Sequence, residues 1–452
     1  MIALMLAAPR SGSGKTTVTC ALLRALQRRG FSPCSFKVGP DYIDPTFHRA
    51  VLGVESRNLD LFLSDADCVR GLFARGCAGH DAAVVEGVMG YYDGLGGVSD
   101  RASSWHVADT LGLPVVLVLP VRGASLTLAA ELKGLCSLRA QSRIVGAILN
   151  ECSPKLCQSI APALERESGV PILGCLPPLE SARIESRHLG LLTAGEIAGL
   201  HERLDTLAAA LEAHVDLARL SGLCSVEAVP ENGKIRREKH AEISMAVASD
   251  KAFNFTYLET LETLRAFGAK IVFFSPLEDR ELPEHIGGLY LPGGYPELYA
   301  EELSVTVKMR ESIASAVRGG MPTVAECGGF LYLCAALCDE AGRAHPMAGA
   351  LPGRAENAGR LVRFGYETLC AESDSLLFRT GERIPAHEFH YWDASECGDA
   401  LRVEKGEQSW RCGFVNETLY AGFPHLYFAG RPVLVERFVA AARDYGERHG
   451  IM

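Results

Sequence analysis

The chain has 452 residues, of which 48% are hydrophobic and 22% charged, and its net charge is -10. This composition is typical of a folded globular protein and excludes extensive disorder, while the length predicts two domains. The negative charge argues against a nucleic-acid partner, because it leaves no broad basic face to neutralise phosphates.

The chain begins with the apolar run Met1–Ala8, which lacks a basic lead-in and continues directly into a glycine-rich loop. It therefore predicts a buried strand rather than a signal peptide. No apolar run reaches the roughly 20 residues that a membrane-spanning helix needs, so we expect no membrane association.

The 15 cysteines are scattered, and none forms a CxxC pair. The spacings that resemble a metal site, Cys152 with Cys157 and Cys334 with Cys338, are better explained by buried thiols. Reduced thiols in this number favour a cytoplasmic location.

Short apolar runs then alternate with amphipathic stretches, which predicts a doubly wound α/β domain over residues 1–221. Buried parallel strands are expected at Ile2–Ala7, Ser35–Val38, Ala82–Val85, Val115–Leu119, Ile144–Leu149 and Ile172–Cys175. Helices are expected between them, including Thr16–Arg29 and Ala124–Leu135.

The segment Gly12-Ser13-Gly14-Lys15-Thr16-Thr17 follows the first strand and begins the first helix. Backbone N–H groups in such a loop wrap a phosphate, and the lysine reaches the terminal phosphates. The Thr16 hydroxyl is then placed to ligate Mg²⁺. Although Pro9 replaces the usual first glycine, the order of strand, loop and helix predicts an ATP site.

Two carboxylates follow neighbouring strands of the predicted sheet: Asp41 follows the second and Glu86 the third. Loops after parallel strands gather at one edge of a sheet, so both acids should face the phosphates. Either acid alone is more often a helix cap or a solvated loop residue. Together with Lys15 they predict binding of Mg²⁺ and ATP.

The pattern changes after residue 221. A linker is expected over residues 222–242, which contain the charged run Arg236–Lys239. A second doubly wound α/β domain is expected over residues 243–452, with strands at Ile243–Ala248, Ile271–Phe274, Leu289–Leu291 and Thr323–Ala325.

Cys327 lies between the last of these strands and a predicted helix, in Ala325-Glu326-Cys327-Gly328-Gly329. This is the pattern of a nucleophile elbow, and a thiol at a helix N-terminus is expected to have a lowered pKa. The N–H groups of Gly328 and Gly294 are candidate oxyanion donors. The required base is one of three histidines, and spacing does not choose among His387, His390 and His425.

Together these motifs resemble the cobyrinate a,c-diamide synthase family, in which a dethiobiotin-synthetase-like ATPase is joined to a class I glutaminase. The resemblance covers nearly the whole chain. The motifs that carry it are Phe36–Pro45, Glu86–Gly90, Arg187–Leu191, Ala252–Phe255, Phe274–Leu277, Gly293–Glu297, Ala325–Gly329 and His387–Tyr391.

The resemblance implies that glutamine is hydrolysed at Cys327 and that ammonia passes internally to the ATP domain. It further implies that ATP phosphorylates the c and then the a acetate group of an anionic corrinoid or related tetrapyrrole, and that ammonia displaces each phosphate. An acyl phosphate is needed because a bare carboxylate resists ammonia.

By the same resemblance, His425 activates Cys327, while Asp41 and Glu86 serve Mg²⁺ and carboxylate activation. Tyr42, Asp44 and Asp93 are implied to support the substrate, and Asn150 to bind adenine. The chain departs from the family pattern at Ala8, Pro9, Pro120, Trp392 and Tyr427. Tyr427 stands two residues after His425, where class I enzymes often have the glutamate of the triad.

Alternatives within the same chemistry are diamidation of hydrogenobyrinate or nickel-sirohydrochlorin. A different class is a P-loop switch ATPase that binds a partner protein, which leaves Cys327 unused. Self-association into a homodimer is also considered.

Overall fold

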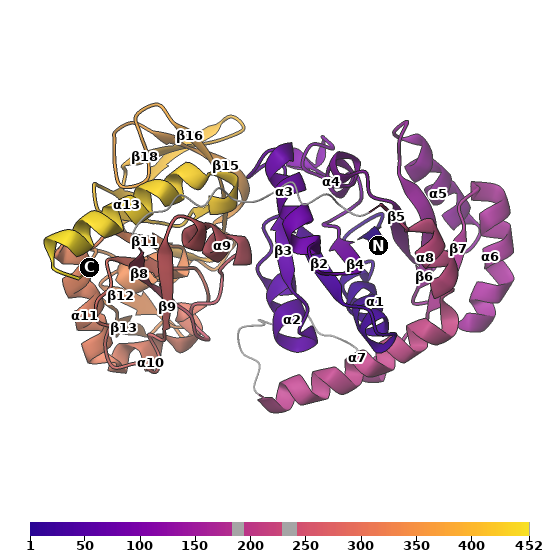
Figure 1. The fold of residues 1–452 in the computed structure, drawn as a ribbon, viewed down its shortest axis with the longest axis horizontal. Coiled ribbons are helices and arrows are strands. Elements are labelled where there is room, and N and C mark those ends of the chain that lie inside the picture. The colour runs from indigo at the N-terminus through magenta and orange to yellow at the C-terminus, as the bar shows by residue number, and fades with distance from the viewer. Residues whose placement is uncertain (183–193, 228–241, 452) are drawn as a thin grey trace. The chain divides into compact units, whose positions relative to one another are not determined.

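The computed structural model describes residues 1–182, 194–227 and 242–451. The chain forms two compact units, unit 1 (residues 1–234) and unit 2 (residues 235–452), as shown in Figure 1. Most of the linker predicted at residues 222–242 falls on residues 228–241, which lie outside the described residues. Residues just before them belong to unit 1, since Ser225 forms a β-bridge with Ile2.

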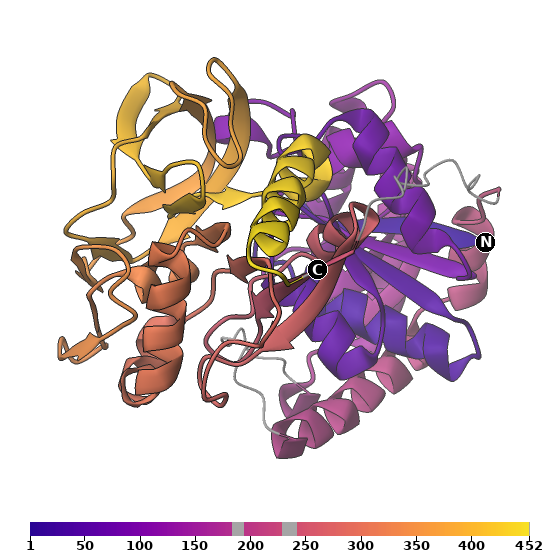
Figure 2. The same ribbon diagram turned by 60° about the vertical axis from the view of Figure 1, so that its left-hand side comes forward.

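Unit 1 is built on a seven-stranded parallel sheet with the order β3-β2-β4-β1-β5-β6-β7. Figure 2 shows helices on both of its faces. The strands are therefore buried along most of their length, and most of them are apolar, as expected when both faces are covered. Their bounds are β1 Ile2–Ala7, β2 Pro33–Val38, β3 Ser56–Leu59, β4 Ala82–Glu86, β5 Val115–Pro120, β6 Ile144–Asn150 and β7 Ile172–Leu176.

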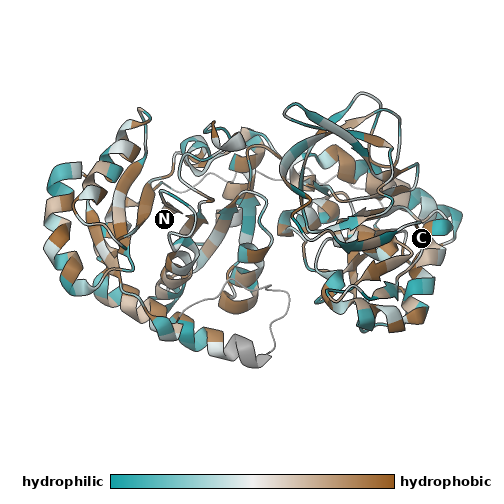
Figure 3. Cartoon of the chain, turned by 180° about the vertical axis from the view of Figure 1, so that it is seen from behind, coloured by the Kyte–Doolittle hydropathy of each residue, from teal (hydrophilic) through white to brown (hydrophobic). Residues whose placement is uncertain are grey.

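The helices of unit 1 bury apolar stripes on this sheet, and Figure 3 shows hydrophobic residues concentrated in the strands. Their bounds are α1 Lys15–Arg28, α2 Ile43–Leu52, α3 Ala66–Cys77, α4 Ser104–Leu111, α5 Thr127–Ser137, α6 Pro154–Ser168, α7 Ala194–His214 and α8 Leu217–Leu223. The predicted doubly wound fold is confirmed. Strand β3 was not predicted, because Ser-Arg-Asn-Leu contains no apolar run.

Unit 2 contains a six-stranded sheet of order β20-β21-β11-β10-β8-β9, in which all neighbours except β20 and β21 pair in parallel. Its strands are β8 Ile243–Ala248, β9 Ala269–Phe274, β10 Gly288–Leu291, β11 Thr323–Glu326, β20 Phe414–Val415 and β21 Leu419–Gly422. The helices of the unit are α9 Leu258–Ala266, α10 Ala300–Val305, α11 Val307–Arg318, α12 Gly328–Leu333 and α13 Pro432–Arg448.

Two further sheets of unit 2 were not predicted. An antiparallel sheet of order β19-β18-β15-β16-β22 comprises β15 Arg363–Ala371, β16 Arg383–His390, β18 Leu401–Lys405, β19 Gln408–Cys412 and β22 His425–Leu426. A smaller sheet of order β13-β12-β14-β17 comprises β12 Ala336–Cys338, β13 Ala344–Pro346, β14 Arg354–Asn357 and β17 Trp392–Ala394. No helix within the described ranges is long and apolar enough to cross a membrane.

The packing of β7 depends on the absence of a side chain at Gly174. Its φ is +131°, and a Cβ there would lie 2.0 Å from the His214 carbonyl oxygen. We predict that Gly174→Ala destabilises unit 1 by more than about 2 kcal/mol, because rigid backbone must move. The matched control is Gly134→Ala in α5, where a Cβ meets nothing within 4 Å. The free energy of unfolding of unit 1 is measured for both variants in urea, with hydrogen exchange of unit 1 peptides as the signal. Equal stability of the two variants would contradict the prediction.

Candidate active sites

The loop between β1 and α1 brings its backbone close to the rest of unit 1. Gly12 and Gly14 have φ of +74° and +85°, in the left-handed region that favours glycine. A Cβ on Gly14 would lie 2.1 Å from Asn150 Nδ2, and that amide donates to the Ser13 carbonyl at 2.9 Å. The start of α1, with Thr17 in its first turn, thus presents backbone N–H groups to an anion. The observed contact of Asn150 is with the loop, and its adenine role stays a prediction.

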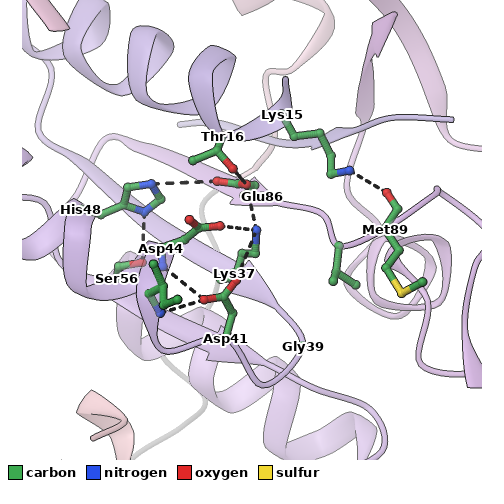
Figure 4. A network of polar contacts seen from close by, with 12 residues as sticks. Lys15, Thr16, Lys37, Gly39, Asp41, Asp44, His48, Ser56, Glu86 and Met89 are labelled. Atoms are coloured by element: carbon green, nitrogen blue, oxygen red, sulfur yellow. Dashed lines mark hydrogen bonds and ion pairs between the residues drawn. The ribbon is translucent and has the colours of Figure 1, made fainter. Parts of the chain in front are cut away.

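Lys15 lies folded over this loop. Its Nζ donates to the Met89 carbonyl at 2.6 Å and to the Arg10 carbonyl at 3.4 Å (Figure 4). Burial lowers the pKa of Lys15 to about 8, with a further contribution from the positive charge of Lys37. Met89 itself has a φ of +49°, an uncommon conformation that turns its carbonyl toward the lysine.

A buried network of charges lies beside the loop. Glu86 Oε1 accepts from the Thr16 hydroxyl at 2.7 Å and from Lys37 Nζ at 2.8 Å. Lys37 also donates to Asp44, and its Nζ lies 3.8 Å from Asp41 Oδ2. The adjacency follows from the sheet, because Lys37 on β2 pairs directly with Glu86 on β4.

Burial opposes charge on all members of this network. It raises the pKa of Glu86 to about 7, although Lys37 acts in the opposite direction. Burial alone would lower the pKa of Lys37, but the carboxylates of Glu86, Asp44 and Asp41 raise it above its usual range. Lys37 was not predicted as a site residue. The one feature of the sequence that points to it is a lysine within a predicted buried strand.

The other predicted residues of unit 1 lie around this centre. Asp41 Oδ1 accepts from the backbone N–H groups of Ile43 and Asp44, so it caps α2 in addition to facing Lys37. Tyr42 follows Asp41 in the chain and is the N-cap residue of α2. Asp93 Oδ2 accepts from the Gly90 N–H at 3.0 Å and holds the turn after β4.

These oxygens suit a magnesium ion shared with phosphate. The Thr16 hydroxyl and the Glu86 carboxylate are adjacent, and Glu86 Oε2 is buried without a hydrogen-bond partner among the described residues. Mg²⁺ is usually bound through one or two carboxylates together with substrate phosphates. Over the described ranges, no group of three or more acidic, histidine or cysteine side chains could hold an ion by itself.

In unit 2, Cys327 lies at a strained turn between β11 and α12. Its φ and ψ are 45° and -103°, and its N–H donates to the Gly422 carbonyl at 2.8 Å. The following glycine is required, because a Cβ on Gly328 would lie 2.9 Å from the Gly294 nitrogen. The predicted oxyanion donors, Gly328 and Gly294, are therefore neighbours.

The structure distinguishes the three candidate histidines. A Cβ on Gly293 would lie 2.5 Å from the His425 ring, so His425 packs against the oxyanion loop. His387 pairs opposite His425 across β16 and β22. His390 instead bonds the Trp392 carbonyl through Nδ1 and stacks on Phe423 with ring centroids 3.8 Å apart. Of the three, His425 is thus seen beside the oxyanion loop, and its role as the base stays a prediction.

The expected lowering of the Cys327 pKa is wrong. Burial raises it well above the usual range of a thiol, and the nearby carboxyl groups of Glu297 and Glu388 raise it further. Burial, with the neighbouring His387 and His390, lowers the pKa of His425 to about 3. The N-terminus of the short helix α12 would lower the pKa of the thiol, but this effect is smaller than the opposite effect of burial.

Tyr427 occupies the position where a triad glutamate was expected. Its hydroxyl donates to Glu259 Oε1 at 2.9 Å, and both side chains are buried. A carboxylate from α9 is thereby attached to the segment that carries His425. The motif Arg187–Leu191 lies outside the described residues.

Two family models each match one half of the chain, and several relatives match nearly its whole length. Residues 4–192 match the CobQ/CobB/MinD/ParA nucleotide binding domain, and residues 244–433 match the CobB/CobQ-like glutamine amidotransferase domain. Three relatives are named cobyrinate a,c-diamide synthase. That of Salmonella typhimurium is 39% identical and is covered over 98% of both chains. That of Synechococcus sp. is 38% identical over 98% of this chain and 99% of its own, and that of Clostridium acetobutylicum is 39% identical over 95% and 98%.

The raised pKa of Cys327 predicts slow alkylation of the glutamine-free enzyme. Its thiolate fraction, and hence its rate with iodoacetamide, should rise about tenfold per pH unit between pH 7 and 9. Mass spectrometry of the peptide, identified by its loss in Cys327→Ala, measures the rate. A plateau already reached at pH 7 would show a lowered pKa instead.

The bond between Tyr427 and Glu259 predicts coupled effects on unit 2. Tyr427→Phe should lower its stability by about 1–3 kcal/mol, because a buried acceptor loses its donor. In a double-mutant cycle with Glu259→Leu, whose side chain cannot accept a hydrogen bond, the two losses should not add. Urea unfolding and glutaminase kcat provide the readouts, and additive losses would mean that the two side chains act independently.

Proposed function

The chain belongs to the cobyrinate a,c-diamide synthase family, and we propose that it amidates the a and c acetate carboxylates of cobyrinate. It is an ATP-dependent carbon–nitrogen ligase with glutamine as the nitrogen donor. The observation that carries the proposal is the presence of two built sites in one chain, a phosphate loop with Lys15 and Glu86 and an elbow with Cys327. We further propose a cytoplasmic enzyme and a homodimer.

In unit 2, we assign glutamine hydrolysis to Cys327 and His425. His425 takes the thiol proton as Cys327 Sγ attacks the carboxamide carbon, and it returns a proton to the departing ammonia. The N–H groups of Gly328 and Gly294 hold the oxyanion. Water then hydrolyses the thioester, which yields glutamate and restores the thiol.

In unit 1, we assign phosphate binding to the backbone of Gly12–Gly14 and to Lys15, whose ammonium must leave the Met89 carbonyl to reach a terminal phosphate. Thr16 and Glu86, with Asp41, would hold Mg²⁺, which neutralises phosphate charge. The substrate carboxylate attacks the terminal phosphorus of ATP and ADP leaves. Ammonia then attacks the acyl phosphate, and phosphate leaves with formation of the amide.

The remaining assignments follow the positions of the side chains. Asp44 contacts Lys37, Tyr42 precedes the first residue of α2, and Asp93 holds the turn after β4; we propose that these three side chains orient the macrocycle. Asp44 is held by Lys37, which fixes the carboxylate in place. Asn150, which supports Ser13, is proposed to bind adenine.

We predict that Cys327→Ala loses glutamine-dependent amidation by about 10³-fold or more but retains ammonia-dependent amidation, because only the thioester step is removed. Lys15→Met should lose both. Purified protein is incubated with ATP, Mg²⁺ and either nitrogen donor, and products are weighed by mass spectrometry.

The same assay identifies the macrocycle. Cobyrinate, hydrogenobyrinate and nickel-sirohydrochlorin are offered separately, and two successive amidations are expected with cobyrinate. Unchanged glutamine-driven activity in Cys327→Ala would refute the role of the thiol, and amidation of another macrocycle alone would correct the substrate.

A further inference from the structure

The buried carboxylate of Glu86 has two unequal oxygens. Oε1 accepts from Thr16 and Lys37, whereas Oε2 has no hydrogen-bond partner among the described residues. Glu86 is 0% exposed, so Oε2 has no contact with bulk solvent. His48 Nε2 lies 3.9 Å from Oε2 (Figure 4), and the Asp44 carboxyl also contacts Glu86.

His48 on α2 is also 0% exposed, and two serine hydroxyls on the side of its ring away from Glu86 orient it. Its Nδ1 lies 2.9 Å from Ser35 Oγ on β2 and 3.4 Å from Ser56 Oγ on β3. When the nearer hydroxyl, that of Ser35, donates to Nδ1, the proton of the neutral ring is on Nε2 and points toward Glu86.

We propose that His48 is a positioning residue that fixes the Glu86 carboxylate for the binding of Mg²⁺ and ATP. The inference rests on the proposed function of unit 1. With Nε2–H directed at Oε2 across 3.9 Å, the ring dipole favours the orientation of the carboxylate in which Oε1 is directed at Thr16. The threonine hydroxyl then donates to Glu86 and leaves its lone pairs for the metal. A shift of about 1 Å would bring Oε2 into hydrogen-bond distance of Nε2.

A simpler role must be separated from this one. Through Ser35 and Ser56, His48 also ties α2 to two strands, and a purely structural histidine would need only its Nδ1. Two amide substitutions distinguish these roles because they imitate different ring nitrogens. Asn places an amide near Nδ1 and keeps the serine bonds, whereas Gln reaches the position of Nε2 and can donate to Glu86.

The test is calorimetric binding of ATP to the full chain with excess Mg²⁺ and with EDTA. His48→Asn should weaken binding in Mg²⁺ about 10–100-fold, as expected for loss of a group that orients a metal ligand. His48→Gln should remain within about threefold of the unaltered protein, and binding in EDTA should change little in either variant. Retained affinity in His48→Asn, or a loss confined to His48→Gln, would overturn the proposal.

Two further measurements test the proposal if the His48 variants misfold, and they do not depend on amidation activity. Nitrogen-15 NMR of labelled histidine should show Nε2 protonated and Nδ1 unprotonated, and the reverse tautomer would overturn the proposal. If both His48 variants unfold, Ser35→Ala, which removes one hydroxyl facing Nδ1, should weaken binding in Mg²⁺ and not in EDTA; unchanged binding would refute the role. Because no macrocycle is involved, failure to amidate cobyrinate would count only against the proposed function.

Discussion

The arrangement of unit 1 depends on one buried cation, Lys37. Its Nζ contacts Glu86 and Asp44 and faces Asp41, from a strand whose residues are all buried. Burying an unpaired carboxylate costs several kcal/mol, and such a group usually becomes protonated instead. Lys37 therefore allows acids to be held, still ionisable, at the carboxyl edge of the sheet.

The phosphate loop adds a second lysine whose surroundings differ from those of Lys37. Lys15 is a second buried cation, but its partners are the neutral carbonyls of Met89 and Arg10. Its pKa falls while that of Lys37 rises, because only Lys37 has carboxylates in direct contact. Lys15 is thus the cation that an incoming phosphate can recruit, whereas Lys37 is committed to the protein's own acids. The two lysines divide substrate binding from maintenance of the site.

The sequence was sufficient for features encoded in a few consecutive residues. The loop at Lys15 and the elbow at Cys327 follow from local strand, glycine and helix patterns, and so does the doubly wound fold. The contacts of Lys37, His48 and Tyr427 could not be predicted, because they depend on which strands and helices become neighbours. Strand order decides that Lys37 meets Glu86, and pairing of β16 with β22 decides that His387 lies opposite His425. The pKa of Cys327 was predicted in the wrong direction because burial is a property of the assembled unit.

The unit 2 site uses burial in the opposite way. Cys327 and His425 are both shifted toward their neutral forms, and a neutral pair is cheaper to bury than a thiolate and an imidazolium. Charge separation therefore needs a compensating anion site. In the mechanism we propose, that compensation arises when the glutamine carbonyl becomes an oxyanion against the N–H groups of Gly328 and Gly294. In that mechanism, the desolvation that raises the pKa of the free thiol also strengthens those two hydrogen bonds, which ties nucleophilicity to an occupied site. Unit 1 holds charge ready for a charged substrate, whereas unit 2 develops charge only when a neutral carboxamide is present.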